Sequence, residues 1–202
     1  PSINSSVVLT SNQLLALTAQ QLGALATGQV STMETTAIAG FSTSQIAGLS
    51  STNLSALDAT QAGALTTTQI GSFSTSQVAG LDATDIQELS STQVSAFTRT
   101  QMVRLGTEAV AALDATQVGA ISSTVIQALN STQIGALESA DIAEFTTTQL
   151  AALSTNQIRA LNTTHVAGMT TEQVSALTTT QLLAMSSTNL SALDANQAAT
   201  EI

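Results

Sequence analysis

The sequence contains few of the residues on which most enzymes and binding proteins depend. Its 202 residues include no cysteine, tryptophan or tyrosine, and only one histidine and one proline. Without cysteine the chain has no disulfide framework and no thiolate ligand, and one histidine leaves too few ligands for a zinc site. The composition therefore predicts no metal site.

Positive charge is also scarce. Three Lys+Arg residues stand against 13 Asp+Glu, so the formal net charge is −10. Such a chain has no basic surface with which to neutralise nucleic-acid phosphates or anionic lipids. Its 43% of hydrophobic residues is too high for a disordered chain, yet no run approaches the roughly 18 consecutive apolar residues of a membrane span. We expect an ordered chain with no nucleic-acid partner and no membrane insertion.

The sequence is built from one short repeat. From Leu9 to Thr200 it divides into 24 consecutive octads without an insertion or deletion, with the consensus L-[STD]-[TSA]-T-Q-[IVL]-[small]-[AG]. Position one is a large apolar residue in all 24 octads, position six is Ile, Val, Leu or Met in 22, and position eight is Ala or Gly in 18. Two bulky anchors and one small residue thus recur every eight residues, which predicts that positions one and six form the core.

The polar positions of the octad predict the start of a helix. Position two is Ser, Thr, Asp or Asn in 20 octads, and position five, three residues later, is Gln in 16. This is the capping-box spacing, in which the N-cap side chain and the N3 side chain each bond the other residue's backbone N–H. In the same register positions one and six are N′ and N4, the two residues of a hydrophobic staple. We therefore expect a short helix over positions three to eight of every octad.

These helices predict an all-α solenoid. A helix of six residues is unstable alone, so each must be held by its neighbours around a continuous axial core. One long helix is excluded because an eight-residue repeat would wind the apolar stripe around its surface. A β-solenoid is the alternative, since Thr, Val and Ile suit strands, although Gln and Ala do not. The repeat does not state how many octads form one turn.

We expect a single solenoid rather than separate domains. Residues 1–8 form an N-terminal lead-in or cap, residues 9–200 the solenoid, and residues 201–202 the C-terminal end. The last octad carries only Ala198 at position six. Degenerate terminal repeats are typical of caps that cover the end of a solenoid core.

The residues that could carry chemistry have structural explanations. His165 replaces the capping Gln of its octad and can serve the same N3 role. Aspartates stand singly, either at the N-cap or in place of the Gln, where the helix dipole stabilises a carboxylate: Asp58, Asp82, Asp114 and Asp194 at the N-cap, and Asp85 and Asp141 at position five. Since the chain has no calcium loop, no nucleophile elbow and no phosphate-binding glycine loop, we expect no catalytic, cofactor-binding or metal-binding residue, no cofactor and no enzymatic activity.

Three charged residues break the pattern. Glu88, Arg104 and Glu144 occupy position eight, where Ala or Gly is the rule. Either position eight is only partly buried and these side chains are solvated, or the solenoid pairs them. Glu88 and Arg104 are two octads apart, so they would align only in a turn of about two octads.

The array resembles the octapeptide arrays, with the pattern LTTxQ[VI]xAL, of long bacterial secreted or surface proteins of the adhesin-like kind. The resemblance covers Leu9 to Thr200 through segments such as LTTTQIGS, FSTSQVAG, LDATQVGA and LTTTQLLA, and it carries no functional residue. It implies an extracellular or cell-surface protein that works as a filament subunit or a rigid stalk. Its expected partners are other copies joined end to end or further repeats of a longer chain. The alternative is a surface-binding module for ice or glycans, because position four is Thr or Ser in 16 octads.

Overall fold

The short helix expected in each octad is present along the described chain. The computed structural model describes residues 8–197, with side chains described up to residue 193. The predicted lead-in, apart from Val8, and the predictions for Ala198 and residues 201–202 lie outside the described residues. Within residues 8–197 there is no strand, so the all-α solenoid is confirmed and the β-solenoid alternative is wrong.

Each helix is four to six residues long except the last. Their bounds are α1 (Ser11–Leu15), α2 (Ala19–Gly23), α3 (Thr27–Val30), α4 (Thr35–Gly40), α5 (Thr43–Gly48), α6 (Ser51–Leu54), α7 (Ala59–Gly63), α8 (Thr67–Gly71), α9 (Thr75–Ala79), α10 (Ala83–Gln87), α11 (Ser91–Val94), α12 (Arg99–Met102), α13 (Thr107–Ala111), α14 (Ala115–Ala120), α15 (Ser123–Ile126), α16 (Ser131–Ala136), α17 (Ser139–Ala143), α18 (Thr147–Ala151), α19 (Thr155–Ala160), α20 (Thr163–Ala167), α21 (Thr171–Ser175), α22 (Thr179–Ala184) and α23 (Ser187–Gln197).

Every helix begins at position three of its octad, as the capping pattern predicts. In sixteen of the helices α1–α22, the N-cap side chain accepts the N3 backbone N–H and the N3 side chain accepts the N-cap N–H. The N-cap residues have extended backbone, with ψ of 156° at Ser74 for example. The chain therefore turns sharply at positions one and two, which we call the junction between two helices.

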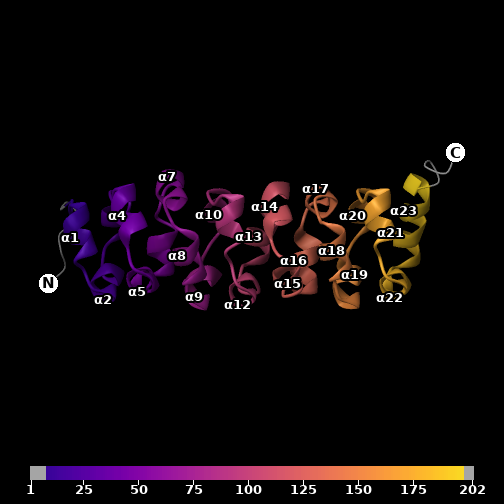
Figure 1. Ribbon diagram of the computed structural model, residues 1–202, viewed down its shortest axis with the longest axis horizontal. Helices are drawn as coiled ribbons and strands as arrows, with labels where there is room; N and C mark the ends of the chain where they lie inside the picture. The colour runs from indigo at the N-terminus through magenta and orange to yellow at the C-terminus, as the bar shows by residue number, and fades with distance from the viewer. Residues whose placement is uncertain (1–7, 198–202) are drawn as a thin grey trace.

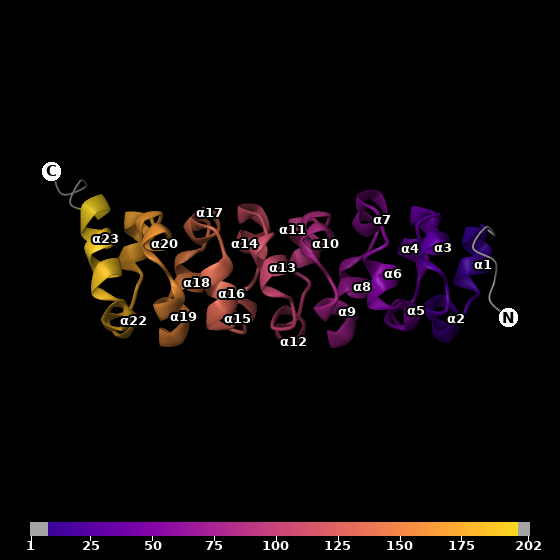
Figure 2. The same ribbon diagram turned by 180° about the vertical axis from the view of Figure 1, so that it is seen from behind.

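Three octads make one turn of the solenoid, which we call a coil. Helices pack against the helix three octads further along, as α2 does on α5 and α16 does on α19; among α1–α23 the pair α7 and α10 is the exception, with little direct contact. The 24 octads of the repeat thus correspond to eight coils of three. The coils follow one another along a single rod, from α1 at one end to α23 at the other (Figures 1 and 2).

The core is one continuous cluster along the rod. It consists almost entirely of residues from positions one and six, and all four phenylalanines belong to it. Position six is the most deeply buried, since Ile46, Ile70 and Ile134 are fully inaccessible to solvent. The predicted staple is therefore also the unit of core packing, because N′ and N4 of each helix enter the same axial core.

Small residues at positions seven and eight allow the coils to approach closely. A Cβ added to Gly48 of α5 would clash with the backbone oxygen of Ala19 in α2. A Cβ added to Gly23 would in turn clash with the backbone oxygen of Gly48. Neither site has room for a side chain, so the consensus for small residues here has a steric origin.

The last described helix departs from the frame. α23 runs for 11 residues through Leu193, where every earlier octad boundary has a junction. A continuous helix bonds its own backbone groups without help from a further coil.

None of the helices in residues 8–197 combines the length and the apolar character needed to span a membrane.

Candidate functional site

The glutamine at position five joins each coil to the one before it. In α9 the Gln77 side-chain oxygen accepts the backbone N–H of Ser74 at 2.7 Å, which is the predicted capping bond. Its Nε2 donates to the carbonyl oxygens of Ile46 at 2.7 Å and Leu49 at 2.8 Å, which belong to the preceding coil. One amide thus caps its own helix and binds the junction beneath it.

The same register is repeated along the rod, and we call this set of side chains the glutamine ladder. Its donors bond carbonyl oxygens 28 to 31 residues earlier, at positions one, six and seven of preceding octads: Gln45, Gln61, Gln69, Gln77, Gln93, Gln101, Gln117, Gln133, Gln149, Gln157, Gln173 and Gln181. The described backbone–backbone bonds outside the helices join residues only three or four apart. Side chains, not the backbone, therefore carry the hydrogen bonding between coils.

Three other side chains take the place of glutamine in the ladder. Asn53 and Asn189 donate to the carbonyl oxygens 28 residues earlier. His165 accepts the Asn162 N–H on Nδ1 at 3.2 Å, and its Nε2 lies 2.8 Å from the Leu137 carbonyl oxygen. The capping role predicted for His165 is confirmed, and both ring nitrogens are engaged in the scaffold.

Five positions lack an amide or imidazole at position five. Ala37, Ala109 and Val125 have no polar group there, and Asp85 and Asp141 have a carboxylate. Asp141 accepts the Glu138 N–H at 2.7 Å, and Asp85 accepts the Asp82 N–H at 2.8 Å and the Ser55 hydroxyl at 2.6 Å. Both aspartates keep the capping bond expected of them, but an ionised carboxylate has no hydrogen to donate to the coil beneath.

The N-cap aspartates behave as predicted. Asp58, Asp82 and Asp114 each accept the N3 backbone N–H of the helix that they begin, at 2.7 to 3.1 Å. The side chain of Asp194 lies outside the described residues. Each of the three carboxylates has a structural role at a helix N-terminus.

The solenoid gathers acidic residues that the sequence analysis treated as single. Two octads, residues 81–88 and 137–144, carry acidic residues at positions two, five and eight, and each stands one coil above an N-cap aspartate. The first acidic cluster is Asp58, Asp82, Asp85 and Glu88, and the second is Asp114, Glu138, Asp141 and Glu144. The 24-residue offset within each cluster is visible in the sequence, but it acquires meaning only once a coil is known to hold three octads.

Burial and mutual repulsion affect one carboxyl group in each cluster. The pKa of Glu88 is raised above its ordinary value of 4.5, first by burial and then by the negative charges of Asp85, Asp58 and Asp82. The pKa of Asp141 is raised above 3.8, chiefly by burial; the bond from the Glu138 N–H lowers it, and the charges of Glu138 and Asp114 raise it. Each cluster therefore contains a carboxyl group that takes up a proton more readily than it would in water.

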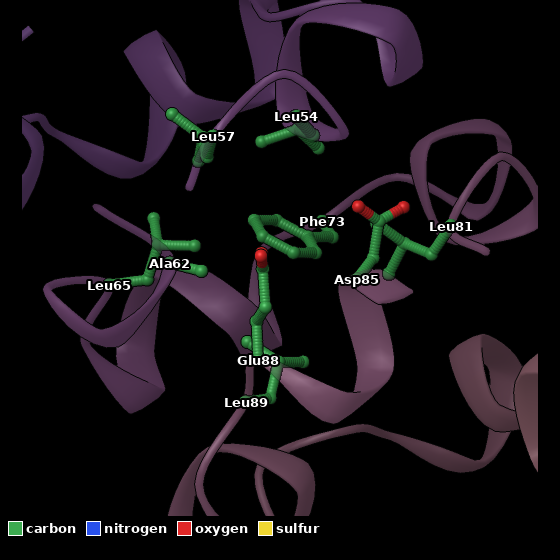
Figure 3. A pocket seen from close by; sticks show the side chains of 9 residues that line it. All are labelled: Leu54, Leu57, Ala62, Leu65, Phe73, Leu81, Asp85, Glu88 and Leu89. Atoms are coloured by element: carbon green, nitrogen blue, oxygen red, sulfur yellow. The ribbon is translucent and has the colours of Figure 1, made fainter. Parts of the chain in front are cut away.

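Glu88 lines a small cavity at the first cluster. The cavity measures about 20 Å³, enough for one water molecule. It lies where position six is Ala62 instead of a larger residue, and the Glu88 side chain extends beside Phe73 and Leu89 (Figure 3). Glu88 is half-buried, which agrees with the alternative that position eight is only partly buried.

The other two charged residues at position eight are exposed, as expected. Arg104 and Glu144 both face solvent. Because a coil holds three octads, Glu88 aligns with Ala64 and Ala112 and not with Arg104.

Position four of the octads supplies exposed hydroxyl groups along the rod. Position four is exposed in every described octad, from Asn12 to Thr188, and is mostly Thr or Ser. Among the described residues, no group of three or more His, Asp or Glu side chains is arranged to hold a metal ion.

The comparisons with known proteins agree with the repeat. A family described as the ALTTAQ repeat matches residues 110–147, 134–171 and 142–179. These matches begin 24 and 8 residues apart, whole multiples of the octad, so they identify a tandem octapeptide-repeat array. No curated protein matches the chain.

Proposed function

We propose that this chain is a non-enzymatic structural repeat protein that acts as a rigid rod. In this proposal it is an extracellular filament subunit or the stalk of a bacterial surface protein. The observation that carries the proposal is the glutamine ladder, because one register of bonds ties each coil to the next along the rod. Such a structure lengthens by repetition and requires no new chemistry.

The last described coil favours contact with further repeats. Leu190 occupies position six and is 39% exposed, whereas Leu150 at the same position is 0% exposed. A second copy, or the next coil of a longer chain, would cover this side chain and remove apolar surface from water.

The proposed location rests on composition and resemblance. The chain contains no cysteine and has a net charge of −10, and its octads resemble those of bacterial surface proteins. Detection of the parent protein on intact cells, by surface labelling with an antibody to this chain, would test the location.

Solution measurements test the shape and the association. If coils stack 8 to 10 Å apart as packed helices do, eight coils form a rod of roughly 70 Å, which small-angle scattering would show as an elongated particle. Sedimentation at rising concentration separates the two versions, because a filament subunit associates and a stalk remains monomeric. A compact globule in scattering would contradict both.

The second candidate is a binding surface for ice or glycans. The observation that favours it is the exposed row of Thr and Ser at position four. Thermal hysteresis of the purified chain, together with a glycan array, tests this candidate. Replacing Thr60, Thr84 and Thr132 with valine should abolish such binding without affecting the rod.

A further inference from the structure

We propose that the two acidic clusters are acid-responsive joints, at which uptake of a proton tightens one coil on the next. The inference concerns the stiffness of the rod and holds for a filament subunit and for a stalk alike. The first joint lies between the octads that carry α7 and α10, whose side chains meet at the cavity beside Ala62, and the second joint lies between α14 and α17.

At the second joint a carboxylate stands where the ladder requires a donor. The side chain of Asp141 is 3% exposed and keeps its bond from the Glu138 N–H. The 28-residue register, which takes His165 to Leu137 and Gln133 to Leu105, places the Leu113 carbonyl opposite Asp141. Two acceptors then face each other across the joint while Asp141 is ionised, and a proton on its carboxyl group converts that contact into a hydrogen bond.

At the first joint the carboxyl group meets an apolar wall. Glu88 lines the cavity left by Ala62, together with Leu57, Leu65 and Phe73 (Figure 3). An ionised carboxylate is poorly solvated there, whereas the neutral acid can pack against these side chains. The raised pKa of Glu88 has the same physical cause as the expected tightening.

The charges around both joints have one sign. Asp141 faces Asp114 at the N-cap of α14, with Glu138 and Glu144 beside it, and His165 of α20 bonds the junction before α17. The neighbouring helices α16 and α18 carry no titratable side chain.

Glu88 faces a similar set. Its acidic neighbours are Asp58 at the start of α7 and Asp82 and Asp85 of its own octad. Helix α13, which packs on α10, carries Glu108 with its side chain exposed. Helices α9 and α11 add no charge. Since no Lys or Arg lies on the helices packed at either joint, protons are the simplest means of relieving the repulsion.

The test uses variants that imitate the protonated joint. Asp141→Asn provides a permanent hydrogen-bond donor. Asparagine already serves as a donor at position five, since Nδ2 of Asn189 donates to the Leu161 carbonyl oxygen at 2.7 Å. The pKa of Asp141 is raised in the folded protein, so as pH falls from neutrality the folded wild type binds a proton at Asp141 before the unfolded chain does. The free energy of unfolding of the wild type therefore rises as pH falls through that pKa. The gain ends near the ordinary value of 3.8.

We therefore expect the variant to melt higher than the wild type at pH 7.5, by roughly 2 to 4 °C. The difference should shrink as pH falls towards 4. Hydrogen exchange, compared between the two proteins at each pH, should show the gain at neutral pH in the amides of α14 and α17 and none in α5. Glu88→Gln should behave in the same way at α7 and α10.

The matched control is Glu172→Gln, at an exposed glutamate outside both clusters. Its melting temperature should follow that of the wild type at every pH. A melting difference for Asp141→Asn that does not change with pH would overturn the proposal, as would a variant less stable than the wild type at pH 7.5. If Asp141→Asn does not fold, Asp141→Gln restores the consensus residue, and its failure would also overturn the proposal.

Discussion

Replacing Gln77 with glutamate would leave the cap of α9 in place while removing its bonds to the preceding coil. Glutamate keeps the oxygen that accepts the Ser74 N–H, and it occupies nearly the same volume. It has no hydrogen for the carbonyl oxygens of Ile46 and Leu49, which now receive bonds of 2.7 and 2.8 Å. The substitution therefore separates the two roles of the ladder residue.

The expected cost follows from that geometry. Gln77 is 3% exposed, and the variant leaves the Leu49 carbonyl oxygen without a donor, at about 1 to 3 kcal/mol. The Ile46 oxygen loses one of two bonds and keeps the one from the Leu49 N–H. Burying the carboxylate adds to this cost. We expect the free energy of unfolding at pH 7 to fall by at least about 2 kcal/mol, which lowers the melting temperature by roughly 4 to 8 °C.

The measurement is a urea or thermal melt at pH 7 and again at pH 4.5. The loss should be partly recovered at the lower pH, because the introduced carboxyl group can donate a hydrogen bond once it is protonated. The control is Gln127→Glu, at an exposed residue, which should change stability by no more than about 0.5 kcal/mol. If Gln77 were only a capping residue, glutamate at N3 would be neutral or slightly stabilising through the helix dipole, and that result would refute the ladder.

Three further predictions test the core, the coil contacts and the absence of a metal site. Leu177→Ala should cost roughly 2 to 5 kcal/mol because it truncates a buried core residue, whereas Thr178→Ala should cost about 1 kcal/mol because it removes an N-cap acceptor; denaturant melts in the reverse order would contradict the assignment of inside and outside. Gly48→Ala should destabilise the rod by about 1 to 3 kcal/mol because its Cβ would meet the Ala19 oxygen, whereas Gly63→Ala, where the added Cβ has open space, should be neutral or stabilising by up to about 1 kcal/mol in the same melts. The melting temperature should not change when millimolar calcium or a chelator is added, and a rise of several degrees with calcium would show that the carboxylates form a binding site.

The sequence by itself determined everything that depends on contacts within one octad. The capping box of Ser74 and Gln77 and the staple of Phe73 and Val78 join residues no more than five apart, so their spacing can be read directly. The role of His165 as a cap was predictable for the same reason, since Asn162 precedes it by three residues.

Only the tertiary structure decided how the octads are wound. The number of octads in a coil depends on the angle at each junction and on how closely small residues such as Gly48 let the coils pack. No single residue or octad determines the total rotation of the chain over the junctions of one coil. The second set of bonds made by Gln77 was missed because the capping box already explained its position, and its partner Leu49 lies 28 residues away.

The acidic clusters show the same limit. Asp114 and Asp141 are each explained by their own octad, as an N-cap and as a substitute for Gln. Their interaction depends on one coil lying on the next, and so does the burial that raises the pKa of Asp141. A local repeat fixes what each octad becomes, whereas the winding of the chain decides which octads meet, because contacts between coils depend on geometry accumulated over three junctions.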